Sequence, residues 1–198
     1  MYSDWRCDGC GPVLPMHIVN HVGADVMEST AERARHVPVP MWCPWPLLPG
    51  WMVTGVGWAG DDRSGPRATA VACSGPAPLG GPADVVLIAE EPGVGLGNRY
   101  AGLPGPDPGD HFAVAVKTTA AHAKVKAAGW PTPLWAVSAV DDRSAYVGEA
   151  KGLWLYAITW PASAGYLFAE DLVLHDLTDW LPTELVYGAP SPYLHGGS

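Results

Sequence analysis

Residues 42–91 of the chain read WCPWPLLPGWMVTGVGWAGDDRSGPRATAVACSGPAPLGGPADVVLIAEE. This stretch holds three apolar runs, at residues 51–58, 68–73 and 85–89, and clusters of Gly, Pro, Asp and Ser separate them. Short apolar runs bounded by such turn residues predict β-strands. The centre of the fold is therefore predicted to be three consecutive antiparallel strands.

The pattern continues on both sides of this stretch. Residues 24–35 carry apolar side chains at helical spacing, and residues 119–128 follow a threonine that can cap a helix and precede a glycine that can end one. Further short strands are predicted at 111–116, 134–140, 145–149, 152–160 and 166–174. We therefore predict the α+β class, with a mainly antiparallel β-sheet or partial barrel and two short helices.

The tetrapeptide DDRS occurs twice, at residues 61–64 and 141–144. An internal duplication of a β-meander would explain the repeat, and so would turn chemistry that arose twice, since Asp and Ser recur at β-turns. In either case we expect the two copies to lie in tight connections, with at least one Asp side chain accepting backbone N–H groups. A shared polar site would require both turns to lie at the same end of the molecule.

Composition and charge exclude several classes of function. The chain has 198 residues, 48% of them hydrophobic, with ten Trp and a formal net charge of −9. Its 11 Lys and Arg form no run, so neither nucleic acid nor an anionic membrane is an expected partner. No apolar run reaches the roughly 20 residues that span a bilayer. The N-terminus lacks the pattern of a signal peptide, so we expect a cytoplasmic protein with reduced cysteines.

Two cysteines near the N-terminus have the spacing of a metal knuckle. Cys7 and Cys10 enclose Asp8 and Gly9, and two thiolates at this spacing can hold one zinc ion. A closed tetrahedral site needs two more ligands. His17 and His21 are candidates, because their i, i+4 spacing would place both imidazoles on one helix face; an exposed polar pair is the alternative interpretation.

If the protein is an enzyme, Cys73 is the candidate nucleophile. This thiol ends an apolar run and precedes Ser-Gly, where backbone N–H groups could face an oxyanion. His122 would act as base, with Asp61 or Asp62 orienting it, in acyl transfer or hydrolysis. The alternative is that Cys73 is a buried packing residue, which is the usual state of a cysteine at a strand end.

A Trp-lined cleft that binds a small ligand is the third hypothesis. Arg99 is the candidate anchor for an anion, and Trp135 is a candidate wall residue. The Gly-rich loop before Arg99 resembles a phosphate-binding loop in composition only. Glu90 and Glu91 stand beside it, and the helix that should follow is short, so we interpret the loop as a connection.

Several long motifs, taken together in order, resemble those of the actinobacterial DUF6758 family of uncharacterised proteins. They include SDWRCDGCGPVLP (3–15), VPMWCPWPLLPGW (39–51), VVLIAEEPGVGLGNRYAG (85–102) and GEAKGLWLYAITWP (148–161). The resemblance implies a zinc ribbon whose first Cys-x2-Cys knuckle lies upstream of Met1, with Cys10 standing where relatives place His. On this basis we expect a gene model truncated at its N-terminus, and zinc only when that ribbon is completed.

The sequence then divides into three predicted parts. These are a partial zinc-ribbon-like segment at 1–22, a helix and Pro-rich linker at 23–50, and a β-rich α+β domain at 51–198. The residues favour a non-catalytic binding or regulatory protein with a zinc-ribbon-like head over an enzyme. The expected partner is a protein or a small molecule.

Overall fold

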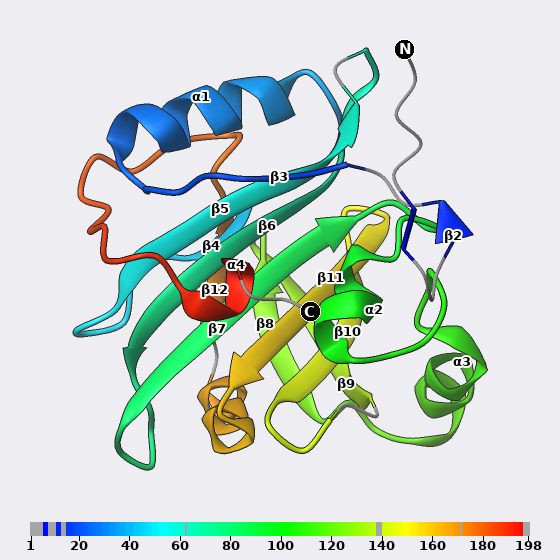
Figure 1. The fold of residues 1–198 in the computed structure, drawn as a ribbon. Helices are drawn as coiled ribbons and strands as arrows, with labels where there is room; N and C mark the ends of the chain where they lie inside the picture. Colours follow the sequence, from blue (N-terminus) through cyan, green and yellow to red (C-terminus); the bar gives the residue numbers. More distant parts are fainter. Residues whose placement is uncertain are drawn as a thin grey trace.

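The computed structural model describes residues 6–7, 11–12, 15–61, 63–137, 140–170 and 172–195. Within these residues, ten strands form one sheet in the order β3-β5-β6-β7-β11-β10-β9-β8-β12-β4, and β1 (Arg6–Cys7) pairs with β2 (Gly11–Pro12) (Figure 1). All neighbours in the large sheet are antiparallel except β12 and β8, which run parallel. The α+β prediction with a mainly antiparallel, unclosed sheet is confirmed.

The strands of the large sheet are β3 (Met16–Ile18), β4 (Trp42–Pro44), β5 (Met52–Asp61), β6 (Gly65–Pro76), β7 (Pro82–Glu90), β8 (Ala123–Ala127), β9 (Trp130–Val137), β10 (Ser144–Ala150), β11 (Leu153–Trp160) and β12 (Leu172–Asp176). The helices are α1 (Ala24–Arg35), α2 (Leu96–Ala101), α3 (Gly109–Thr118), α4 (Pro192–His195) and the 3-10 helix η1 (Ala162–Ala169). The predicted helix at 24–35 and the predicted strands in residues 51–89 and 134–160 are confirmed.

Two three-stranded meanders form the middle of the sheet. β5-β6-β7 and β9-β10-β11 join through the antiparallel pair β7 and β11. The first DDRS turn links β5 to β6, and the second lies directly before β10. The first turn lies at the end of the sheet where Glu90 of β7 pairs with Trp154 of β11. The second turn lies at the end where Ser144 of β10 pairs with Thr159 of β11. The two turns are therefore at opposite ends of the sheet. This arrangement excludes a shared polar site, while the duplicated meander stays a hypothesis.

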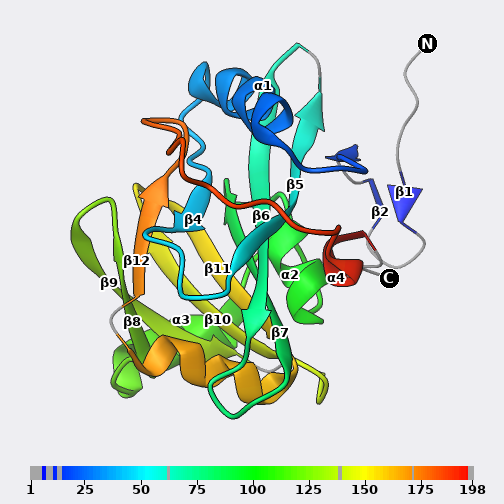
Figure 2. The same ribbon diagram turned by 90° about the vertical axis from the view of Figure 1, so that its left-hand side faces the viewer.

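The sheet is strongly curved, so that its β12-β4 edge turns toward β6 and β7 (Figure 2). Apolar side chains fill both faces of the central strands. Along β7, Val85, Leu87 and Ala89 pack into the core inside the curve, whereas Val86 and Ile88 pack into a second core outside it. A central strand covered on both faces needs this unbroken apolar run, which is why residues 85–89 show no polar alternation.

The predicted helix at 119–128 is wrong, because residues 123–127 form strand β8. Val125 and Ala127 are buried, whereas Lys124 and Lys126 are exposed, and this alternation of apolar and charged residues suits a half-buried strand. Ala and Lys favour helices in isolation, but pairing with β9 on one side and β12 on the other overrides that preference.

Two further predictions are corrected in neighbouring segments. Residues 111–116 were predicted as a strand but lie in helix α3, where Phe112 packs inward and Val114 and Val116 remain exposed. The predicted strand at 166–174 is divided between the 3-10 helix η1 and strand β12. Within the described residues, no helix has the length and apolar character needed to cross a membrane.

Candidate functional site: an apolar pocket at the edge of the sheet

The predicted metal ligands are only partly described by the structure. Cys7 lies in β1, which pairs with β2, and Cys10 lies outside the described residues. His17 lies in strand β3 rather than in a helix, and its ring stacks on Trp58 with centroids 4.0 Å apart. The helical pairing of His17 with His21 is therefore wrong. Among the described residues, no group of three or more His, Cys, Asp or Glu could hold a metal ion.

The predicted catalytic set does not come together around Cys73. The thiol is buried in β6, and a hydrogen bond with Cys43, together with burial, raises its pKa well above the ordinary value. A raised pKa keeps the sulfur protonated and unreactive. Asp61 lies at the far end of the β5-β6 hairpin, and Asp62 lies outside the described residues.

Asp61 and His122 have other roles in the fold. The Asp61 carboxylate accepts the N–H groups of Arg63 and Ser64, each at 2.8 Å, and the Ser64 hydroxyl at 2.6 Å. These contacts, that of the Ser64 hydroxyl first, lower the pKa of Asp61 and confirm the predicted Asp turn. His122 accepts the Ala136 N–H on Nδ1 at 3.2 Å, in the segment that leads into β8.

Arg99 and Trp135 do not line the apolar pocket beside Trp45 and Trp51. Arg99 lies on the short helix α2, and Trp135 lies on β9, where its indole N–H donates to the carbonyl of Thr119 at 3.2 Å. Trp135 also meets Phe112 edge to face at 6.0 Å. Trp135 thus packs against α3 and the residue that follows it, and the prediction that Arg99 and Trp135 bind a ligand stays a prediction.

The Gly-rich loop before Arg99 is occupied by a carboxylate of the chain itself. Glu90 Oε2 accepts the N–H groups of Leu96 and Gly97, at 2.7 and 3.1 Å, at the start of α2. Gly97 is required there because a Cβ atom would lie 2.2 Å from the Tyr156 ring. These two N–H groups are thus bonded within the chain, and the loop connects β7 to the short helix α2.

Glu90 is fully buried, and among the described residues its second oxygen, Oε1, has no hydrogen-bond partner. Burial is the main reason that the pKa of Glu90 rises from 4.5 to about 7, and the negative charge of Asp107 adds to it. The N–H groups of α2 oppose the shift without cancelling it. Tyr156 donates its hydroxyl to Asn98 at 2.8 Å beside this carboxyl group. With a pKa of about 7, the buried Glu90 carboxyl group gains or loses its proton near neutral pH.

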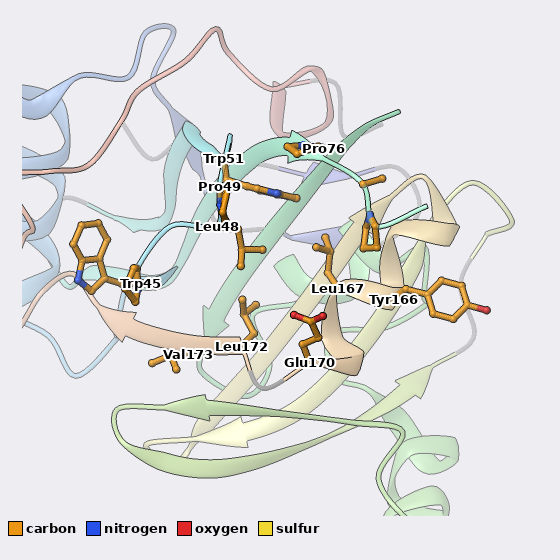
Figure 3. A pocket seen from close by; sticks show the side chains of 13 residues that line it. Trp45, Leu48, Pro49, Trp51, Pro76, Tyr166, Leu167, Glu170, Leu172 and Val173 are labelled. Carbon is orange, nitrogen blue, oxygen red and sulfur yellow. The ribbon is translucent and has the colours of Figure 1, made fainter. Parts of the chain in front are cut away.

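An apolar pocket lies where three distant segments meet at the edge of the curved sheet (Figure 3). The Pro-rich linker after β4, the end of β6 with its turn, and the η1-β12 connection enclose about 490 Å³. Its lining is almost entirely apolar and rich in Trp and Pro: Trp45, Pro46, Leu48, Pro49, Trp51, Pro76, Ala77, Pro78, Tyr166, Leu167, Glu170, Leu172 and Val173.

Close packing fixes the walls of this pocket. Trp51 lies against Gly75 of β6, where a Cβ atom would come within 2.5 Å of the indole, so only glycine allows this approach. Trp45 meets Trp180 edge to face at 6.1 Å. Leu167 and Leu172 are nearly buried and form the floor together with Leu48. The walls are thus aromatic and proline side chains of the linker, packed against the end of β6 and against Trp180.

Sequence reasoning finds only one of the segments that form this pocket, the Trp- and Pro-rich linker. The Pro-rich linker docks on the core, where Trp42 is buried and Trp45 packs against it. Nothing in the sequence linked that segment to Leu167 or Glu170, which are more than 110 residues away along the chain. These residues were missed because pairing of β12 with β4 brings them to the linker.

Comparison with known proteins identifies a family but no function. The model of a family described as "Family of unknown function (DUF6758)" matches residues 1–194. No curated protein and no solved structure matches the chain.

Proposed function

Because the chain belongs to the DUF6758 family of unknown function, we propose its function from its own geometry: it is a non-catalytic protein that binds a small apolar molecule in the pocket beside Trp45 and Trp51. The observation that carries this proposal is an open apolar cavity with preformed walls. A volume of about 490 Å³ lies within the range of about 300–1,000 Å³ that is usual for small-molecule sites.

The chemistry of the lining supports binding rather than catalysis. Only one charged side chain, that of Glu170, is present among the described residues of the lining, and no histidine or cysteine accompanies it. Binding of an apolar ligand against these walls removes apolar surface from water, which is favourable by about 25 cal/mol per Å². The pocket therefore suits a hydrocarbon or aromatic ligand. Its described lining holds no pair of titratable groups that could act as general acid and base.

The proposal includes a cytoplasmic location and a regulatory use of the N-terminal segment. Cys43 and Cys73 are neighbouring free thiols, which suits a reducing compartment. A zinc-ribbon-like head built on Cys7 and Cys10 would give a second surface for partner contact. Its test is metal analysis of the purified chain and of its Cys7→Ser variant: bound zinc that the substitution removes is expected, and a chain that binds no zinc would refute it.

Binding in the pocket can be measured with an uncharged fluorescent probe. N-phenyl-1-naphthylamine becomes bright in apolar surroundings, so saturable enhancement with one site per chain is expected. Val173→Asp places a charge in the pocket wall, at a side chain that is 40% exposed, and should weaken binding roughly tenfold or more. Val114→Asp, on the exposed face of α3, is the matched control and should leave binding unchanged.

Circular dichroism and thermal unfolding of both variants establish that they are folded. Failure of the folded wild-type protein to bind the probe saturably would refute the proposed function. Equal loss of binding in Val173→Asp and Val114→Asp would also refute it, because the probe would then bind elsewhere.

A further inference from the structure

Among the described residues that line the pocket, Glu170 is the one with a charged side chain. Glu170 follows the last residue of η1, and its side chain extends toward the pocket's leucines, whereas the ring of Tyr166 points away from them (Figure 3). Among the described residues, the carboxylate makes no hydrogen bond and no ion pair, although the structure pairs several other surface carboxylates, such as those of Glu32 and Glu91. The pocket thus presents an uncompensated negative charge beside an apolar floor.

No positive charge in the lining balances it. The described lining residues include no Lys, Arg or His. The chain as a whole has a formal net charge of −9, so its average field also repels anions. An anionic ligand, such as a fatty acid, would have to place its carboxylate beside Glu170 without a partner, which is unfavourable.

The floor of the pocket offers additional apolar depth. Leu48, Trp51, Leu167 and Leu172 also bound a small void of about 10 Å³ beneath the pocket, which is closed on its other side by Pro44, Leu47 and Val85. Its lining is apolar, so the void has no groups to hold a water molecule.

Taking the proposed binding function as its basis, we propose that the ligand is a cationic amphiphile, with an ammonium or similar head at Glu170 and an apolar tail over Leu48 and Leu167. The negative rim and the apolar floor complement the two ends of such a molecule. Burial of the tail supplies most of the affinity. The ion pair with Glu170 supplies selectivity for the head group. Because Glu170 is exposed, solvent screens this ion pair and limits the gain to about fivefold in Kd.

Three ligands with the same alkyl chain test the charge of the head group. Octylammonium, 1-octanol and octanoate are each titrated below their aggregation limits against the protein loaded with N-phenyl-1-naphthylamine. We expect octylammonium to displace the probe at about fivefold lower concentration than 1-octanol, and octanoate to be the weakest. The preference for octylammonium should shrink as salt is added.

Glu170→Gln removes the charge while keeping the shape of the side chain, and it should bring octylammonium and 1-octanol to the same affinity. Glu28→Gln on α1 removes an equal charge outside the pocket and should leave the preference intact. If all three ligands displace the probe equally, or octanoate does so best, the cationic ligand is refuted and the binding function stands. If the probe itself does not bind, the binding function fails first. Persistence of the preference in Glu170→Gln also refutes the role of Glu170.

Discussion

Replacing Glu90 by Gln should make the protein more stable at neutral pH and remove part of the dependence of its stability on pH. Glu90, the last residue of β7, is fully buried beside the start of α2, and no described residue bonds its Oε1. Burial raises its pKa from 4.5 to about 7. Glutamine has the same shape, its carbonyl can accept the same two N–H groups, and it carries no charge at any pH.

The sign follows from proton binding. Between pH 4.5 and 7 the folded chain holds a proton on Glu90 that the unfolded chain has lost, so the free energy of unfolding falls as the pH rises through this window. A shift of about 2.5 pKa units corresponds to about 3 kcal/mol at about 1.36 kcal/mol per unit. The stabilisation is fully present below pH 4.5 and is lost above about pH 7. Asp107, whose charge also raises the pKa, is present in both proteins.

The assay is urea unfolding of wild type and Glu90→Gln at pH 4, 5, 6, 7 and 8, followed by Trp fluorescence. Other titrating groups are common to both proteins and cancel in the difference between the two free energies of unfolding. We expect this difference to grow by about 3 kcal/mol in favour of Gln between pH 4 and pH 8. A difference that stays constant over this range would show that Glu90 titrates normally, and the reasoning from its burial would be refuted.

Three further predictions concern packing, reactivity and a buried ion pair. Gly97→Ala should destabilise the protein by about 1–3 kcal/mol in urea unfolding, because the new Cβ would lie 2.2 Å from the Tyr156 ring; an unchanged midpoint would contradict this contact. Cys73 should be alkylated by iodoacetamide only when the chain unfolds, and fast labelling of its peptide in the native protein, read by mass spectrometry, would reinstate it as a nucleophile. Asp176→Asn should cost about 1–3 kcal/mol at pH 7, since it breaks the pair with Lys151 at 2.6 Å. Burial raises the pKa of Asp176, but Lys151 and hydrogen bonds lower it overall, so this cost should fall as the pH drops below 3.8; a cost that does not fall would argue against the pair.

The sequence by itself determined those features that depend on neighbouring residues. The strands at 51–58, 68–73 and 85–89 form because apolar runs between Gly, Pro and Asp turns have few other ways to bury themselves. Helix α1 follows from its apolar spacing, and the turn at Asp61 follows from the short reach of an Asp side chain to the N–H groups two and three residues ahead. The α+β class is the sum of such local preferences.

Only the tertiary structure decided the features that join distant segments. Residues 123–127 became a strand because β9 and β12 offered hydrogen bonds that outweighed a helical preference. Arg99 and Trp135 were predicted near a cleft, yet each is held elsewhere by its own element. The pocket exists because the curve of the sheet brings the Pro-rich linker to Leu172 and Glu170. No local pattern encodes a contact across more than 110 residues, since it arises from strand pairing and shared burial rather than from neighbours in the chain.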